Sequence, residues 1–192
     1  QPDCGETSYE GHNRLLDYKM LVTGGDSAIG RAAAIAYAKE GADVAINYLP
    51  SEEQDAQEVK AVIEKAGRKA ILIPGDIRDE QFNYDLVEQA YKELGGLDNV
   101  TLVAGHQQYH DKLEEFDTQS FKETFETNVY PVFWTVQKAL DYLQPGASIT
   151  TTSSVQGYNP NPLIHDYAAS KAAIISLTKS FSEQLGEQGI RV

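Results

Sequence analysis

Short apolar runs alternate along the chain with longer segments in which apolar residues recur at helical spacing. Runs rich in β-branched and aliphatic side chains are typical of buried strands, and a spacing of three to four residues is typical of helices that cover a sheet. The runs predict strands at 19–23, 43–48, 70–74, 100–104 and 147–152. The periodic segments predict helices at 31–39, 52–66, 81–94, 120–143 and 167–185.

This alternation predicts an α/β fold, a Rossmann-type doubly wound parallel sheet with helices on both faces. Residues 18–192 are expected to form one domain, and residues 1–17, which are polar and contain Pro2 and two glycines, to form an extended N-terminal arm. Residues 189–192 are expected to begin a sixth strand, so the sheet is expected to lack its C-terminal strands.

A glycine-rich turn joins the first predicted strand to the first predicted helix. Its sequence is Thr23-Gly24-Gly25-Asp26-Ser27-Ala28-Ile29-Gly30. Glycines let the backbone approach a pyrophosphate, which the helix N-terminus then stabilises. An ordinary turn with glycines would look similar, and the position between a strand and a small-residue helix favours phosphate binding.

A tyrosine and a lysine, Tyr167 and Lys171, lie four residues apart on the last predicted helix and therefore share one face. A tyrosine has a reference pKa of about 10, and a nearby ammonium lowers such a pKa by stabilising the phenolate. This pairing suits proton transfer to a carbonyl oxygen. The same spacing is also common on helix surfaces, so the interpretation depends on two residues that precede it, Asn128 and Ser154.

Together these motifs resemble the short-chain dehydrogenase/reductase family. Asn128, Ser154, Tyr167 and Lys171 match its catalytic tetrad in order and spacing, and the turn matches its glycine motif except that Ala28 replaces the middle glycine. The resemblance implies that Tyr167 transfers the proton and that Lys171 stabilises the phenolate and holds the nicotinamide ribose. It also implies that Ser154 polarises the carbonyl and that Asn128 bends its helix and anchors a water in a proton relay.

The resemblance implies where a dinucleotide lies. An aspartate, Asp76, is expected to hold the adenine amino group, although a role in a turn or helix cap is equally open. Ser153 is the alternative to Ser154 but fits the spacing less well. The expected cofactor contacts are Gly24, Asp26, Ser27, Ala28, Ile29, Gly30, Asn47, Tyr48, Leu49, Asp76, Ile77, Ala104, Gly105, Tyr167 and Lys171.

The end of the second predicted strand bears on cofactor choice. It reads Asn47-Tyr48-Leu49, without the acidic residue that typically binds the ribose 2′-hydroxyl of NAD. We therefore expect NADP to be preferred, with measurable use of NAD. Arginine is also missing there, so Asn47, Ser51 and backbone donors, with Arg31 less certain, are candidates for the 2′-phosphate, which Glu52 and Glu53 would oppose if they turned inward.

Composition excludes several classes of partner. The 192 residues include 16 Lys and Arg against 29 Asp and Glu, a net charge of −13 that argues against nucleic acid or an anionic membrane. The single cysteine, Cys4, excludes an intrachain disulfide and a cysteine-rich zinc site and predicts a reducing, cytoplasmic compartment. His106 and His110 are interpreted as solvated loop residues, and we expect no metal.

The resemblance extends to one subgroup, the NADP-dependent aldehyde reductases and general-stress oxidoreductases that have an N-terminal arm. It implies an NADP-preferring reductase of aldehydes or ketones. A sugar or alcohol dehydrogenase and a catalytically idle nucleotide-binding scaffold are the alternatives. We also expect a homotetramer assembled through the helices that carry Asn128 and Tyr167, with apolar surface from Phe121, Phe125, Val132, Phe133 and Trp134.

Overall fold

A single parallel sheet organises the computed structural model, which describes residues 3–192. The strand order is β3-β2-β1-β4-β5. The strands are β1 (Lys19–Thr23), β2 (Asp43–Tyr48), β3 (Ala70–Pro74), β4 (Asn99–Leu102) and β5 (Ser148–Thr151). All neighbouring pairs run parallel. The predicted fold class is confirmed.

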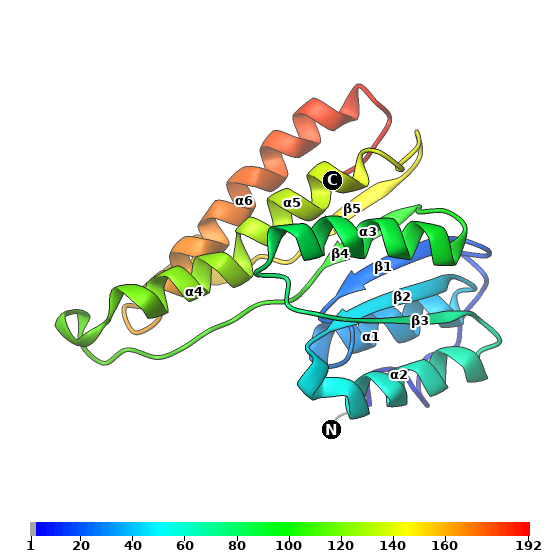
Figure 1. Ribbon diagram of the computed structural model, residues 1–192, viewed down its shortest axis with the longest axis horizontal. Coiled ribbons are helices and arrows are strands. Elements are labelled where there is room, and N and C mark those ends of the chain that lie inside the picture. The colour runs from blue at the N-terminus through cyan, green and yellow to red at the C-terminus, as the bar shows by residue number, and fades with distance from the viewer. Residues whose placement is uncertain (1–2) are drawn as a thin grey trace.

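Helices cover both faces of the sheet (Figure 1). They are α1 (Ala28–Lys39), α2 (Glu53–Lys65), α3 (Glu80–Leu94), α4 (Thr118–Asn128), α5 (Tyr130–Ala139) and α6 (His165–Gly186). Three short 3-10 turns join them, η1 (Pro50–Glu52), η2 (Leu113–Glu115) and η3 (Val155–Gly157).

Alternate residues of β1, β2 and β3 enter two separate cores. Leu21 of β1 packs with side chains of α3, α5 and α6, whereas its neighbours Met20 and Val22 pack with side chains of α1 and α2. Successive side chains of a strand point to opposite faces, so a sheet covered on both sides needs apolar residues at nearly every position. This explains why the strands read as continuous apolar runs.

The predicted single helix at 120–143 is wrong, because the structure has two helices there. Val129 separates α4 from α5 with φ −110° and ψ −54°, and Pro131 occupies the first turn of α5. Proline has no N–H to donate to the carbonyl four residues earlier, Thr127, and its ring crowds that turn. Other predicted boundaries shift by a few residues, with α1 beginning at Ala28.

The N-terminal arm is not extended as predicted but turns back onto the end of α1. The carboxylate of Glu40 accepts hydrogen bonds from the Tyr9 hydroxyl, from the backbone of His12 and Arg14 at 3.0 Å, and from the Arg14 guanidinium. These bonds hold the pKa of Glu40 well below its usual range. The first two residues of the predicted arm, 1 and 2, lie outside the described residues.

The last residues lie beside β5. Arg191 forms an isolated parallel bridge with Ser148, and its carbonyl accepts from Ile149 N–H at 2.8 Å. The structure assigns no strand to these residues, so the further strand that the sequence predicts stays a prediction.

Candidate active site

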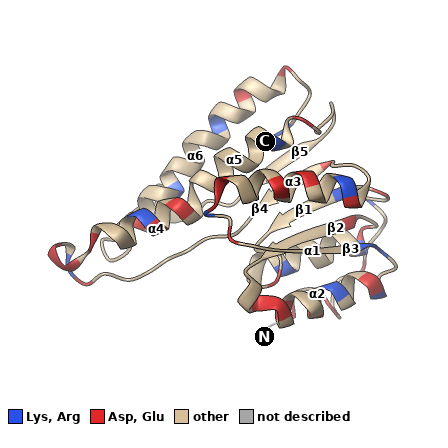
Figure 2. Ribbon diagram, viewed as in Figure 1, with Lys and Arg blue, Asp and Glu red and all other residues tan. Residues whose placement is uncertain are grey.

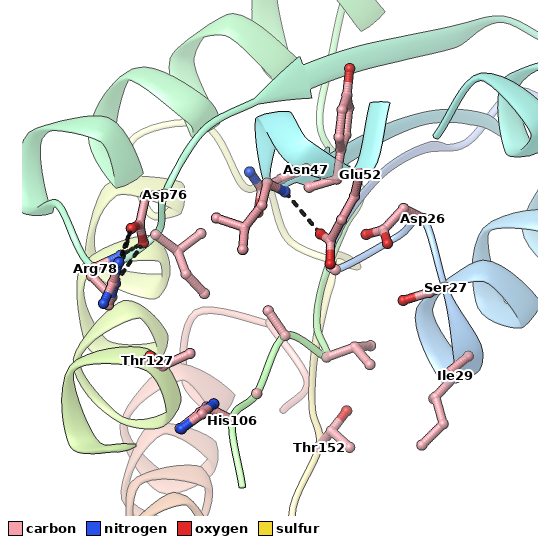
Figure 3. A pocket seen from close by; sticks show the side chains of 18 of the residues that line it. Asp26, Ser27, Ile29, Asn47, Glu52, Asp76, Arg78, His106, Thr127 and Thr152 are labelled. Atoms are coloured by element: carbon pink, nitrogen blue, oxygen red, sulfur yellow. Dashed lines mark hydrogen bonds and ion pairs between the residues drawn. The ribbon is translucent and has the colours of Figure 1, made fainter. Parts of the chain in front are cut away.

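A cleft of about 650 Å³ opens at the carboxyl ends of the strands, above the point where the strand order reverses between β1 and β4. Ligands of doubly wound sheets bind at this position. Figure 3 shows side chains from the turn after β1 and from the ends of β2, β3 and β5 converging on it. The expected cofactor residues that line it are Gly24, Asp26, Ser27, Ala28, Ile29, Asn47, Tyr48, Leu49, Asp76, Ile77, Ala104, Gly105, Tyr167 and Lys171.

The remaining expected cofactor residue, Gly30, lies behind the turn rather than in the cleft wall. A Cβ at Gly30 would stand 1.9 Å from the carbonyl oxygen of Gly24, so only glycine lets α1 start this close to β1. Gly24 has φ +63° and a Cβ there would stand 3.0 Å from Ala104. Bare backbone therefore forms the floor on which a pyrophosphate fits. Ser27 precedes α1 without a side-chain cap, and a helix N-terminus favours an anion.

Ala28, which replaces the family's middle glycine, is held at φ +45°. An L-residue with a side chain loses about 1–2 kcal/mol in the left-handed region, where glycine loses little. The turn has therefore kept the backbone conformation that glycine favours, with a methyl group in it. The departure seen in the sequence is a local strain and leaves the fold of the turn intact.

Lys171 and Tyr167 face the same cleft from α6. The Lys171 ammonium lies 5.4 Å from the centre of the Tyr167 ring and donates a 2.8 Å hydrogen bond to the carbonyl of Thr152. Burial lowers the pKa of Lys171 to about 8. At neutral pH the lysine is still mostly charged, so it can stabilise a phenolate or bind hydroxyl groups.

Asn128 lies at the last position of α4 and is buried rather than exposed to the cleft. Its side-chain oxygen accepts from His106 N–H at 2.6 Å, and its amide nitrogen donates to the His106 carbonyl at 2.9 Å and to the Ser170 hydroxyl at 3.0 Å. These bonds tie the segment after β4 to α6 beside Lys171. Asn128 thus orders the wall of the cleft from behind.

The two candidate serines have different partners. Ser153 donates its hydroxyl to the carbonyl of Lys171 at 2.8 Å, which commits its proton to the backbone of α6. Ser154 accepts from Gln156 N–H at 3.2 Å, and an accepting hydroxyl keeps its own proton for another acceptor. Ser154 is not among the residues that form the cleft wall. The bonding favours Ser154 over Ser153 for contact with a substrate oxygen.

Asp76 lies in the cleft wall, and its carboxylate is already hydrogen-bonded to Arg78. Its carboxylate accepts from the Arg78 side chain at 2.6 and 2.9 Å and from Arg78 N–H at 2.9 Å, which lowers the pKa of Asp76. The turn role that the sequence left open is therefore present. A contact with adenine remains a prediction.

The two histidines after β4 lie in the expected loop but have different surroundings. His106 lines the cleft, whereas the side chain of His110 is 11% exposed, packs at a tilt against the Phe116 ring and lies 4.0 Å from Asp166. Within residues 3–192, no cluster of His, Cys, Asp or Glu is arranged to hold a metal ion. The interpretation as a solvated residue is wrong for His110, because the rings of Phe116 and His165 pack against it.

Several cleft residues were not expected from the sequence. Glu123 and Thr127 of α4 and Gln107 after β4 line the cleft, and α4 is placed there by its packing on α5 and α6, which no local motif indicates. Figure 2 marks acidic residues along the ribbon at the start of α2, where Glu53 and Asp55 lie in the first turn. Among the described lining residues, the acids are Asp26, Glu52, Asp76 and Glu123, and the bases of fixed charge are Arg78 and Lys171.

Comparison with known proteins identifies the family. The sequence pattern of the family described as short chain dehydrogenase matches residues 19–192. The chain belongs to the short-chain dehydrogenase family. Its Rossmann-type fold agrees with that membership. Within the described residues, no helix is long and apolar enough to cross a membrane.

Some relatives of the chain are named only as oxidoreductases, and others are named for a particular reaction. The chain is 60% identical over 191 residues to "Uncharacterized oxidoreductase YhxD" of Bacillus subtilis, covering all of this chain and 64% of that protein. It is 35% identical over 196 residues to "NADPH-dependent aldehyde reductase 1, chloroplastic" of Arabidopsis thaliana, covering all of this chain and 68% of that protein.

A solved short-chain dehydrogenase of Burkholderia cenocepacia in complex with NADP superposes with a TM-score of 0.87 at 37% identity. The match covers 93% of this chain and 73% of that chain. The chain spans 64% of the length of the Bacillus subtilis relative and 65% of the length of a relative from Escherichia coli.

Proposed function

We propose that this protein reduces the carbonyl group of a small aldehyde or ketone with hydride from a nicotinamide dinucleotide. The observation that supports this most directly is the placement of Lys171 and Tyr167 in the same cleft as the glycine turn. The turn suits a pyrophosphate and the α6 pair suits proton transfer, so one cleft contains both halves of a hydride-transfer site.

In the proposed reaction the bound dinucleotide supplies or accepts the hydride. Tyr167 donates its hydroxyl proton to the carbonyl oxygen as that oxygen gains negative charge. Lys171 stabilises the resulting phenolate through its ammonium, 5.4 Å from the ring centre, and is held in place by the Thr152 carbonyl. Ser154 donates to the same substrate oxygen, and Asn128 keeps the segment after β4 docked on α6. In the oxidative direction each proton movement reverses.

The cofactor expected from the end of β2 is NADP, because Asn47, Tyr48 and Leu49 include no acid. The names of the Arabidopsis and Burkholderia relatives support use of NADP by members of the family. Use of NAD remains open to this chain, because the acids of the cleft outnumber its fixed bases.

We further propose a homotetramer in a reducing, cytoplasmic compartment, acting on a small molecule and not on nucleic acid or membrane. The large side chains of Phe121, Tyr130 and Phe133 are 40%, 46% and 45% exposed on α4 and α5. Adjacent exposed aromatic residues of this size are typical of an interface. Val132, which was expected to contribute, is instead buried in the core.

The proposed function is tested by nicotinamide absorbance with the full-length protein, using panels of aldehydes, ketones, sugars and alcohols with both cofactors in both directions. Turnover of a carbonyl with a reduced cofactor supports it. Turnover only of sugars or alcohols in the oxidative direction would replace it with the dehydrogenase alternative. Dinucleotide binding with no turnover of any substrate would replace it with the nucleotide-binding scaffold.

A further inference from the structure

Glu52 places a carboxylate in the part of the cleft that lies beyond β2. It is the last residue of η1, it is half-buried, and it belongs to the cleft wall together with Leu49. Figure 3 shows its carboxylate directed into the cleft, on the same side as Asp26. This acid comes from the turn that follows the strand and not from the strand itself.

Two reciprocal hydrogen bonds fix that carboxylate. Leu49 N–H donates to Glu52 Oε2 at 3.2 Å, and Glu52 N–H donates to the Leu49 carbonyl at 2.8 Å. Pro50, between them, has a fixed φ that favours the tight turn. The side chain is therefore held at the cleft rim and does not have to be ordered when a ligand binds.

The following residue, Glu53, is arranged differently although it is also a glutamate. Glu53 is exposed and is not part of the cleft wall. Its carboxylate accepts hydrogen bonds from the Tyr48 hydroxyl at 2.6 Å and from the Gln57 amide at 2.8 Å. The two neighbouring acids thus have separate environments. Only Glu52 faces the space where a ligand would lie.

Three groups suited to binding a phosphate at this end already have other partners. The Asn47 amide donates to the carbonyls of Ile73 and Gly75 at 3.2 and 3.1 Å. Arg31 pairs with Glu6 at 2.8 Å and with Glu58 at 3.2 Å. Arg78, the nearest base in the wall beyond β3, pairs with Asp76.

Negative charge at this end is reinforced by Asp26, which is 2% exposed and lines the same cleft. In doubly wound sheets the adenosine ribose of a dinucleotide lies beyond the end of the second strand, where an acid accepts its hydroxyls. A 2′-phosphate brings up to about two further negative charges to that place. The carboxylates that already face this part of the cleft would repel the 2′-phosphate. Among the described residues that line the cleft, no unpaired base lies at this end to offset the repulsion.

We propose that Glu52 is a specificity-determining residue, whose carboxylate accepts a hydrogen bond from the 2′-hydroxyl of the adenosine ribose and disfavours a 2′-phosphate. The inference rests on the proposed function, since it requires a nicotinamide dinucleotide in the cleft. It revises the cofactor expected from β2, and the protein should bind NAD at least as well as NADP.

The test compares Glu52→Gln with Glu53→Gln in the full-length protein. Glutamine keeps an oxygen that can accept from Leu49 N–H, so the turn is retained while the charge is removed. Dissociation constants of oxidised NAD and NADP are measured by titration calorimetry for the wild type and both variants, and thermal denaturation confirms that each variant is folded. The quantity compared is the ratio of the two constants, which cancels any general change in the cleft.

We expect Glu52→Gln to shift this ratio at least tenfold towards NADP, which corresponds to about 1.4 kcal/mol, and Glu53→Gln to leave it within about twofold. Glu52→Lys should shift the ratio further in the same direction. An unchanged ratio in both Glu52 variants, or an equal shift in Glu53→Gln, would overturn the inference while leaving the proposed function intact. Failure of the wild type to bind either dinucleotide would overturn the proposed function and this inference together.

Discussion

The ammonium of Lys171 lies over the ring of Tyr167, 5.4 Å from its centre, and is anchored there by a hydrogen bond to the Thr152 carbonyl. The two side chains come from successive turns of α6, and the anchor comes from the segment after β5. Helical spacing brings the pair onto one face, but the sheet decides where that face points. The chemistry of the site depends on both conditions.

Tyr167→Phe should lower kcat at least a hundredfold while leaving the dinucleotide dissociation constant within about twofold. The ring still packs, but the proton donor is removed, and general acid catalysis contributes about 10²–10⁴-fold. Steady-state kinetics and calorimetry on the full-length protein measure both quantities. Tyr158→Phe is the matched control, because Tyr158 is 73% exposed and outside the cleft wall. Activity of the Tyr167 variant within tenfold of wild type would show that Tyr167 is not the proton donor.

Lys171→Met should be more stable than wild type at pH 7, with the difference shrinking as pH rises. Burial lowers the pKa of Lys171 to about 8. Between pH 8 and about 10.5 the unfolded state binds more protons than the folded state, so wild-type stability rises with pH. At about 1.4 kcal/mol per pKa unit, the difference in free energy of unfolding between Lys171→Met and wild type should fall by up to about 3 kcal/mol over this pH range.

Urea denaturation of wild type and Lys171→Met at pH 7, 9 and 10 measures this trend. The control is Lys179→Met, which replaces an exposed lysine on the same helix and should leave a difference that does not vary with pH. A pH-independent difference for the Lys171 variant would mean that the lysine is not held in a desolvating environment.

Ala28→Gly should raise the free energy of unfolding by about 0.5–1 kcal/mol. It relieves the left-handed backbone at φ +45°, and the gain exceeds the extra freedom of glycine in the unfolded chain. Because the methyl group also lines the cleft, we expect dinucleotide binding to tighten. Denaturation and calorimetry test both effects. Ala33→Gly, inside α1, should instead destabilise by about 1 kcal/mol. If Ala28→Gly lost as much stability as Ala33→Gly, the backbone at Ala28 would not be strained.

Gly30→Ala should destabilise the fold by at least ~2 kcal/mol and weaken dinucleotide binding. Its new Cβ would stand 1.9 Å from the Gly24 carbonyl oxygen and 2.7 Å from the Gly24 carbonyl carbon, so the turn has to move. Gly186→Ala at the end of α6 is the control, because nothing lies within 4 Å of its Cβ. Equal melting temperatures for the two alanine variants would refute the close approach.

The full-length protein should be a homotetramer, and Phe133→Glu should shift it towards smaller species. A charge at a contact between exposed aromatic side chains of α4 and α5 is costly to bury. Light scattering at micromolar concentration measures the mass. Leu16→Glu replaces a residue that is 55% exposed on the N-terminal arm, outside α4 and α5, and should leave the mass unchanged. A monomeric wild type would exclude the tetramer.

Local patterns in the sequence were sufficient for the strands, most helices and the glycine turn. Apolar runs such as 43–48 form buried strands because both sheet faces need covering, and the turn after Thr23 forms because glycine alone accepts its close approaches. The expected cofactor residues meet in one cleft for the same reason, since parallel strands all end at one edge.

The tertiary structure decided what depends on segments that are distant in sequence. The hydroxyl of Ser153 is bound to the Lys171 carbonyl of α6, whereas that of Ser154 accepts a bond within its own turn, and this difference distinguishes the two serines. The break between α4 and α5, by contrast, follows from the local Pro131. The bonds between Leu49 and Glu52 are local, but only the packed fold shows that the Glu52 carboxylate they hold lies in the wall of the cleft. Hydrogen bonds and burial between remote segments leave no periodic signal in a sequence, so only the packed fold determines them.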